Sequence, residues 1–207
     1  MTSVYKEFGP FRAWLRWQPA DPEREANDAL EQIHESLRNA MAEDDRKGAT
    51  GEWVGLLGFS QGAKMCASLL FLQQARAEKF GGYHRVGPNF RFAVLLAGRG
   101  PLVALDPELV MMPGLVDASS LSVTSGSAQP SFTALEHRLR LPTIHVHGMQ
   151  DPGLDLHRKL LFRHCDPRHA RLIEWDGNHR VPIKTKDVTP VVEEILSMAA
   201  KTGVSMA

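Results

Sequence analysis

Short apolar runs alternate with helix-like segments along most of the chain, and this alternation limits the fold more than any other feature. Continuous apolar runs bounded by turn residues are typical of strands that are buried on both faces of a parallel sheet. Four such runs are Trp53–Phe59, Phe92–Ala97, Thr143–His147 and Arg171–Trp175. Strands that alternate with helices predict an α/β fold, with a mostly parallel sheet and helices on both of its faces.

The connecting segments carry helical signals. Asp21-Pro22 is typical of a helix start, because Asp caps well and Pro suits the first helical position, and apolar residues follow at steps of three and four to about Asp45. Further helices are expected over Ala63–Ala77, Leu154–His164 and Thr189–Lys201. We find no internal repeat, and we expect the 207 residues to form a single domain over residues 1–207.

Composition argues against several classes of protein. Lys and Arg together number 24, as do Asp and Glu, so the formal net charge is zero and a nucleic-acid partner is not expected. No apolar stretch approaches the roughly 18 residues of a membrane span, so no membrane association is expected. The N-terminal residues do not resemble a secretory signal. Cys66 and Cys165 are expected to be reduced thiols of a cytoplasmic protein.

One local motif points to chemistry. Gly58-Phe59-Ser60-Gln61-Gly62 matches G-x-S-x-G and lies between a predicted strand and a predicted helix. There a sharp turn would expose Ser60 as a nucleophile, and the Gln61 backbone N–H would donate to an oxyanion of bound substrate. Gly58 and Gly62 are expected to be small because neighbouring backbone passes close. The alternative is an ordinary strand-to-helix turn.

A serine nucleophile needs a base, and the base needs an orienting acid. His179 follows the last predicted strand, and Asp151 follows the strand before it. Both would lie at the carboxyl edge of the sheet, where open parallel sheets place their sites. Asp151 also has a structural interpretation as a helix cap before Pro152. Asp155 and Asp176 are the competing candidates for the acid.

The remaining histidines are interpreted structurally. His145 and His147 alternate on a predicted strand, but no third ligand stands at metal spacing, so we expect packed side chains and neither a metal nor a cofactor. His137 and His164 are expected at the surface or at helix ends.

Two further segments are candidates for pocket walls. Gly98-Arg99 follows the second predicted strand, where it would line a pocket or form a simple turn. Residues 99–133 fall where a lid or substrate-binding insertion would sit. Its apolar side chains would line a tunnel or simply pack against the domain: Met111, Met112, Leu115 and Phe132.

Taken together, these motifs resemble the fungal serine hydrolase (FSH) family of the α/β-hydrolases. The matching pieces run in order along about residues 8–200: Gly58–Ala63, Phe92–Gly98, Leu141–Gly148 with Asp151-Pro152, and Gly177–His179 with Pro182. The resemblance implies an α/β-hydrolase fold that cleaves ester or thioester bonds without a metal or diffusible cofactor. It also implies that such a protein releases a polyketide acyl chain from a synthase carrier protein. The alternatives are a carboxylesterase on small acyl esters and a catalytically impaired homologue that acts by binding.

The sequence departs from this family at its N-terminus. The family opens with a strand that ends in a His-Gly-type loop, and this loop supplies the second oxyanion donor. Nothing before Asp21 matches that strand and loop, so we expect a fold that is truncated at the N-terminus, from a truncated product or an incomplete gene model. Such a truncation would leave Trp53–Phe59 with an unpaired edge, and losing one oxyanion donor typically lowers turnover by about 10²–10³. The alternative is that a partner chain or a domain swap supplies the missing strand.

Overall fold

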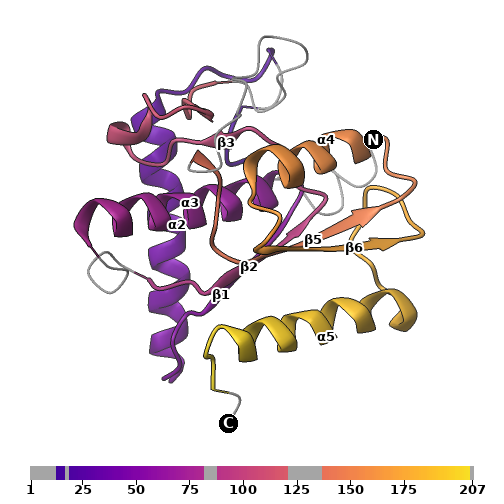
Figure 1. Cartoon of the computed structure of the whole chain (residues 1–207). Coiled ribbons are helices and arrows are strands. Elements are labelled where there is room, and N and C mark those ends of the chain that lie inside the picture. The colour runs from indigo at the N-terminus through magenta and orange to yellow at the C-terminus, as the bar shows by residue number, and fades with distance from the viewer. Residues whose placement is uncertain (1–12, 17–18, 82–87, 121–136, 206–207) are drawn as a thin grey trace.

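A parallel sheet of four strands forms the centre of the molecule (Figure 1). The computed structural model describes residues 13–16, 19–81, 88–120 and 137–205. The strand order is β1-β2-β5-β6, and every neighbouring pair is parallel. The strands are β1 (Gly55–Phe59), β2 (Phe92–Leu96), β5 (Thr143–Gly148) and β6 (Ala170–Trp175). All four predicted strands are therefore confirmed, with ends that shift by one or two residues.

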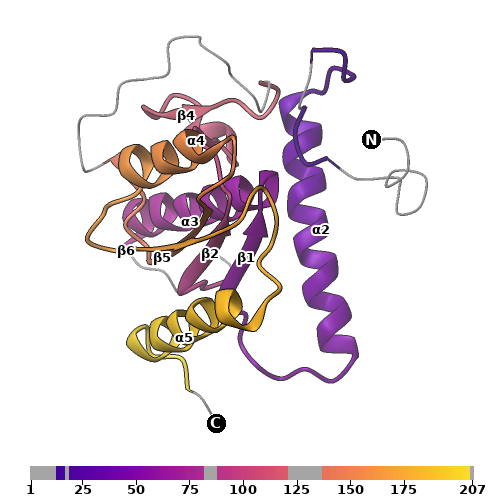
Figure 2. The ribbon, with the colours of Figure 1, turned by 90° about the vertical axis from the view of Figure 1, so that its right-hand side faces the viewer.

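Helices cover both faces of this sheet (Figures 1 and 2). The two faces show in β2, where Ala93 and Leu95 pack into the core shared with α3, while Val94 and Leu96 pack into the core shared with α5. The predicted α/β class is confirmed. The helices are α2 (Ala26–Arg46), α3 (Gln61–Phe80), α4 (Leu154–Lys159) with a π-helical turn over Leu160–His164, and α5 (Thr185–Lys201).

The predicted start of the first helix is wrong by several residues. The helix α2 begins at Ala26, after Glu25 in extended backbone, rather than at Asp21-Pro22. The physical reason is a contact that local patterns do not show. The Arg16 side chain donates to the carbonyl oxygens of Pro19 and Asp21, which holds the residues before the helix in a turn.

The segment after β2 is more structured than a lid. It forms the short parallel strands β3 (Leu102–Val103) and β4 (Leu115–Val116), with a 3₁₀ turn over Pro107–Leu109 between them. Residues 102–105 are buried, and Leu115 belongs to the core beneath α3. Met111 is almost fully exposed, and Phe132 lies outside the described residues. In its described part, this segment thus contributes residues 101–105 and Leu115 to the core, while Met111 and its neighbours lie at the surface.

The strand β1 lies at an edge of the sheet. Among the described residues it pairs with β2 on one side only, and Leu57 in its middle is 65% exposed. An apolar groove of about 270 Å³ runs beside it, lined partly by Ile33 from α2 and by Gly62 and Met65 from α3. Figure 2 shows α2 standing beside β1 and α3.

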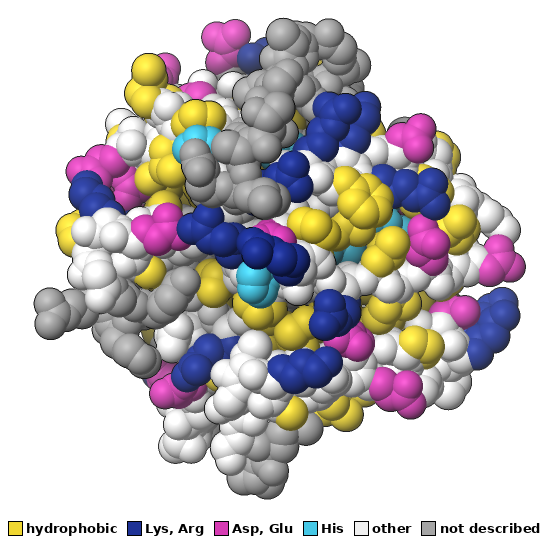
Figure 3. All heavy atoms as spheres, in the orientation of Figure 1, with side chains coloured by type: hydrophobic (Ala, Val, Ile, Leu, Met, Phe, Trp, Pro, Cys, Tyr) yellow, Lys and Arg dark blue, Asp and Glu magenta, His cyan; other side chains and the backbone are white. Residues whose placement is uncertain are grey.

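The surface is of mixed charge. Figure 3 shows basic and acidic side chains interspersed over one face, with apolar side chains between them. Several form local ion pairs, such as Arg158 with Glu174 at 3.0 Å and Arg16 with Glu23 at 3.5 Å. No helix within the described ranges has the length and apolar character that crossing a bilayer requires.

The turn from β1 into α3 depends on one glycine. A Cβ on Gly58 would lie 2.4 Å from the backbone of Gly62 and 2.6 Å from the Ala63 nitrogen, closer than real side chains approach. A Cβ on Gly62 would meet no atom of the described residues within 4 Å. The expectation that both glycines must be small is therefore right for Gly58 and wrong for Gly62, whose missing side chain would point into the open groove.

We predict that Gly58→Ala lowers the free energy of unfolding by about 3 kcal/mol, because the new methyl group forces α3 away from β1. Gly62→Ala is the matched control, and it should leave stability unchanged or raise it by up to about 1 kcal/mol. Urea denaturation followed by circular dichroism measures both. Equal stability of the two variants would contradict this account of the turn.

Two buried histidines lie on β5 beneath the carboxyl edge of the sheet. Thr143 Oγ1 lies 3.1 Å from His145 Nε2, while neither ring nitrogen of His147 has a hydrogen-bond partner among the residues that the structure describes. Burial, followed by the nearby ring of His147, lowers the pKa of His145 to about 3. Burial, followed by the nearby ring of His157, lowers the pKa of His147 to about 4. Both rings are therefore neutral packing groups at neutral pH.

A neutral buried histidine makes folding sensitive to acid. The unfolded chain binds a proton at His147 near its ordinary pKa of 6.5, whereas the folded chain does so only near 4. The stability that His147 contributes is therefore complete above about pH 6.5 and is lost as the pH falls towards 4. Within that window, each such group makes the free energy of unfolding fall by about 1.4 kcal/mol for each pH unit of acidification.

We predict that His147→Phe reduces this slope by about 1.4 kcal/mol per pH unit between pH 6 and pH 4. At pH 7 its stability should match the parent within about 1 kcal/mol, because the ring is retained and no hydrogen bond is lost. Urea unfolding at a series of pH values measures the slope. The measurements from pH 7 to pH 8, where both proteins should behave alike, are the control. An unchanged slope below pH 6 would refute a neutral His147.

Candidate active site

Ser60 stands at the sharp turn between β1 and α3. Its backbone has φ 55° and ψ −114°, in a region that residues with a side chain rarely occupy. The Ser60 N–H donates to the Leu96 carbonyl oxygen of β2 at 2.8 Å, which holds the turn against the neighbouring strand. Such a conformation costs about 1–3 kcal/mol and is found mostly where function requires it.

His179 and Asp151 complete a chain of hydrogen bonds that begins at Ser60. His179 Nε2 lies 3.0 Å from Ser60 Oγ, and His179 Nδ1 lies 2.6 Å from Asp151 Oδ2. The imidazole also packs against Phe59, with ring centroids 4.9 Å apart. The structure thus brings together the three residues that the sequence singled out, although they are separated by up to 119 positions.

The loops that carry Asp151 and His179 are pressed against each other. The N–H of Met149 donates to the Trp175 carbonyl oxygen at 2.9 Å, and the N–H of Gln150 donates to the Gly177 carbonyl oxygen at 2.8 Å. A Cβ on Gly148 would lie 2.5 Å from that same Gly177 oxygen. The two loops therefore extend the pairing of β5 with β6 beyond the strands, which fixes Asp151 relative to His179.

The Asp151 carboxylate is buried and fully engaged. Its side chain is 1% exposed, and Oδ1 accepts from the Gly153 N–H at 2.7 Å. Burial opposes its ionisation, but hydrogen bonds from Gly153, His157 and His179 outweigh burial and bring the pKa of Asp151 to about 2. The group is thus a fixed anion that accepts from His179. The interpretation of Asp151 as a helix cap also accounts for one of its contacts, because the Gly153 N–H that it accepts from lies just before α4.

The competing acids lie elsewhere. Asp155 is exposed on α4, and Asp176 is exposed and accepts from Gln150 Nε2 at 2.6 Å. Neither has a described hydrogen bond to His179.

Gln61 uses its side chain and backbone differently. Its side-chain oxygen accepts from the backbone N–H groups of Trp14 at 2.7 Å and Leu15 at 3.3 Å, and its amide nitrogen donates to the Leu15 carbonyl oxygen. The side chain therefore ties the N-terminal segment to the Ser60 turn. The backbone N–H belongs to the first residue of α3, where helix donors lack intrahelical partners. That N–H suits the predicted oxyanion role.

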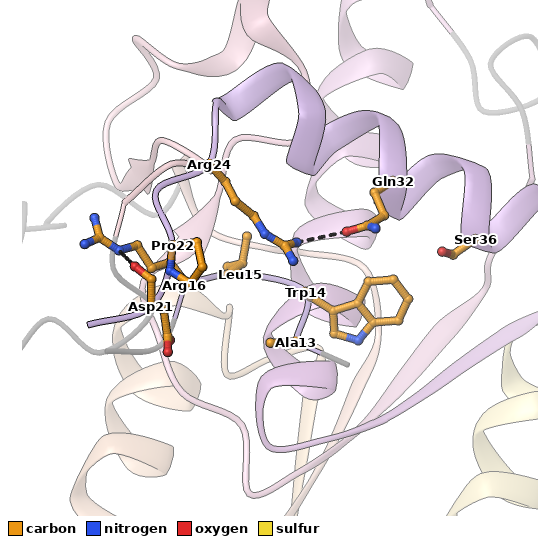
Figure 4. A pocket seen from close by; sticks show the side chains of 9 residues that line it. All are labelled: Ala13, Trp14, Leu15, Arg16, Asp21, Pro22, Arg24, Gln32 and Ser36. Carbon is orange, nitrogen blue, oxygen red and sulfur yellow. Dashed lines mark hydrogen bonds between the residues drawn. The ribbon is translucent and has the colours of Figure 1, made fainter. Parts of the chain in front are cut away.

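A cavity of about 780 Å³ lies between this N-terminal segment and α2 (Figure 4). Trp14 and Leu15 line it from one side and Gln32 and Ser36 of α2 from the other, and Arg24 donates to Gln32 across it at 2.9 Å. Ser60 and His179 are not among its lining residues. Gln61 connects the two regions because it holds Trp14 and Leu15 by hydrogen bonds.

The other residues that the sequence analysis considered make contacts that are mainly structural. Gly98 lies behind the site, because a Cβ there would meet Leu160 at 2.8 Å and its carbonyl oxygen contacts His157. The Arg99 guanidinium lies against Gly153. His164 ends a helical turn as expected but is buried rather than at the surface, whereas His137 is half-buried.

His157 is a site residue that the sequence did not reveal. It lies on α4, and its Nε2 is 2.9 Å from Asp151 Oδ2, the same oxygen that faces His179. In the sequence, His157 is only a histidine six positions after Asp151, and many helices carry a histidine by chance.

The cluster of Asp151, His157 and His179 raises the question of a metal ion, since their donor atoms lie within 4.8 Å of one another. The separations of 2.6 Å and 2.9 Å from the carboxylate oxygen to the two rings are hydrogen-bond distances. Two ligands on a tetrahedral zinc ion with bonds of about 2.0–2.1 Å lie roughly 3.3 Å apart. These separations therefore fit hydrogen bonds between the carboxylate and the two rings, and they do not fit three ligands of one zinc ion.

Comparison with known proteins places these residues in a family. The family described as Serine hydrolase (FSH1) matches residues 3–191. Esterase pigG of Monascus ruber is 59% identical over 207 residues, which cover 99% of this chain and 76% of that protein. Probable esterase tazC of Aspergillus terreus is 56% identical and covers 100% of this chain, which spans 77% of that protein.

Solved structures are more distant. A fungal esterase from Rhizomucor miehei superimposes with a TM-score of 0.49 at 15% identity, over 84% of this chain and 60% of that one. The family match and the high identity to fungal esterases carry the assignment. The chain belongs to the serine hydrolase (FSH1) family, and it is a hydrolase of the esterase type.

Proposed function

We propose that Ser60 is the nucleophile of this esterase, His179 its general base and Asp151 the acid that orients the base. The observation that carries the proposal is the unbroken path from Ser60 Oγ through His179 to Asp151 Oδ2, with contacts of 3.0 Å and 2.6 Å. The carboxylate accepts from Nδ1–H, which leaves the lone pair of Nε2 facing the serine hydroxyl. The 207 residues act as one domain in this proposal.

Acylation follows from this geometry. Ser60 Oγ attacks the carbonyl carbon of the bound acyl group, and its proton passes to His179 Nε2. The carbonyl oxygen becomes an oxyanion, and the Gln61 backbone N–H donates to it at the positive end of α3. The bond to the leaving alcohol or thiol then breaks, and His179 returns the proton to that group. The acyl chain is left as an ester on Ser60.

Deacylation repeats these steps with water. His179 removes a proton from a water molecule, whose oxygen attacks the acyl carbon, and the Ser60 oxygen leaves with that proton. The products are a carboxylic acid and the free enzyme. Throughout, Asp151 stays ionised, because its hydrogen bonds lower its pKa to about 2.

We further propose that the natural substrate is an acyl thioester held by the phosphopantetheine arm of a polyketide synthase carrier protein. The support is the family resemblance of the motifs, since the named relatives are described only as esterases. A small acyl ester is the alternative substrate. The cytoplasmic location is part of the same proposal, because both cysteines are buried and unbridged and suit a reducing compartment.

Asp151→Asn should lower kcat by roughly 10⁴-fold, because the neutral amide does not stabilise the imidazolium and its NH₂ group can hold His179 in the wrong tautomer. Asp155→Asn and Asp176→Asn replace the two competing acids with the same chemistry and should stay within about twofold of the parent. Steady-state hydrolysis of a p-nitrophenyl ester measures all three. A large loss in either control, with an active Asp151→Asn variant, would assign the acid elsewhere.

Substrate class is decided by paired assays. We expect a higher kcat/KM for acyl groups on a phosphopantetheine thioester than for the same acyl groups on a p-nitrophenyl ester. Ser60→Ala should abolish both activities, by about 10⁶-fold in kcat. A preference for the simple ester would favour the carboxylesterase alternative. Turnover that survives Ser60→Ala would contradict the proposed nucleophile.

A further inference from the structure

The catalytic arrangement proposed above uses one imidazole on Asp151, but the structure provides two. Both His179 Nδ1, at 2.6 Å, and His157 Nε2, at 2.9 Å, face the same oxygen, Oδ2. The two rings are nearly parallel, with an interplanar angle of 23° and centroids 5.9 Å apart. His157 is completely buried, so it reaches neither substrate nor solvent. Any role in the reaction must therefore pass through Asp151.

Both ring nitrogens of His157 face acceptor oxygens. Nδ1 lies 2.9 Å from the carbonyl oxygen of Gly98, in the loop after β2, while Nε2 faces the carboxylate. Both partners are acceptors, and a neutral imidazole carries only one N–H. Burial lowers the pKa of His157, although its contacts with Asp151 and Gly98 oppose this effect. One of the two contacts is therefore the donated hydrogen bond.

The carboxylate is the stronger acceptor. Hydrogen bonds to an ionised oxygen are about twice as strong as those to a neutral carbonyl. Asp151 is kept ionised by its surroundings, and its other oxygen is already taken by the Gly153 N–H. The proton of His157 therefore belongs on Nε2.

No neighbour of His157 offers the same donor. His147, whose ring centroid lies 5.7 Å away, has no hydrogen-bond partner on either nitrogen within the described part of the chain. The charge of Arg99 acts on His157 and disfavours its protonation, but no described hydrogen bond joins Arg99 to Asp151. Within the described residues, the side chains that donate to Asp151 are His157 and His179.

We propose that His157 is a positioning residue, which donates from Nε2 to Asp151 Oδ2 and holds the carboxylate in the orientation that His179 requires. This inference rests on the proposed roles of Ser60, His179 and Asp151. It adds a fourth side chain to the arrangement, which links α4 to the loops after β5 and β6. Without the donor, only the Gly153 N–H and His179 hold the carboxylate, so its orientation is less restrained and the alignment of His179 with Ser60 weakens.

Two conservative substitutions separate this role from a purely structural one. The amide nitrogen of Gln reaches the position of Nε2, so His157→Gln keeps a donor to Asp151 and loses the contact with Gly98. The shorter Asn reaches the position of Nδ1, so His157→Asn places an amide nitrogen opposite the Gly98 carbonyl oxygen and loses the donor to Asp151. Both variants are made in the full chain, and kcat is expressed per folded protein as measured by near-UV circular dichroism.

We expect His157→Asn to lower kcat on a p-nitrophenyl ester by roughly 10- to 100-fold with KM nearly unchanged, because misalignment affects the chemical step. His157→Gln should restore most of that loss. The reverse order would show that the contact with Gly98 is what matters, and equal effects of the two variants would show no specific donor role. Either result would overturn the proposal.

A double-mutant cycle provides a second, independent test. Asp151→Asn removes the charged carboxylate to which His157 donates. Adding His157→Asn to the Asp151→Asn variant should therefore lower kcat further by less than about twofold. A full further loss would show that His157 acts by another route and would refute the proposal. The parent and Ser60→Ala proteins are assayed alongside. An inactive parent protein would contradict the proposed function itself, whereas an active parent with indifferent His157 variants would contradict only this inference.

Discussion

The buried carboxylate of Asp151 is the interaction on which the site depends. It accepts hydrogen bonds from the Gly153 N–H ahead of α4, and it faces His157 on that helix and His179 in the loop after β6. A buried anion without such partners would be strongly unfavourable, so these elements must meet around it for the chain to fold. The same contacts keep the carboxylate ionised at neutral pH, which an orienting acid requires.

Much of this arrangement follows from the sequence, because its determinants are local or lie at predictable places. The strand β2 is a continuous apolar run, and it is buried on both faces. The turn at Ser60 follows from a strand, a close glycine at position 58 and a helix. Asp151 and His179 each follow a strand of one parallel sheet, so the shared carboxyl edge brings them together although they are 28 positions apart in the sequence.

The remaining features depend on contacts between distant residues, which local patterns do not encode. The start of α2 is set by Arg16, whose guanidinium holds carbonyl groups ahead of the helix. Residues 102–105 look like part of a loop, yet they are buried beside α3. His157 joins the site only because α4 packs against the loop at Gly98. Gly62 lies beside an apolar groove, and the motif alone does not show that this groove is there.

The most direct test of the central claim is to identify the residue that a fluorophosphonate probe modifies. Such a probe reacts with a serine only when a base activates it, so it reports the Ser60–His179–Asp151 path without any assumption about substrate. We predict one covalent adduct per chain, located on Ser60 by mass spectrometry and formed much more slowly in Asp151→Asn. A folded protein that is not labelled at Ser60, or one labelled equally fast without the Asp151 carboxylate, would contradict the account.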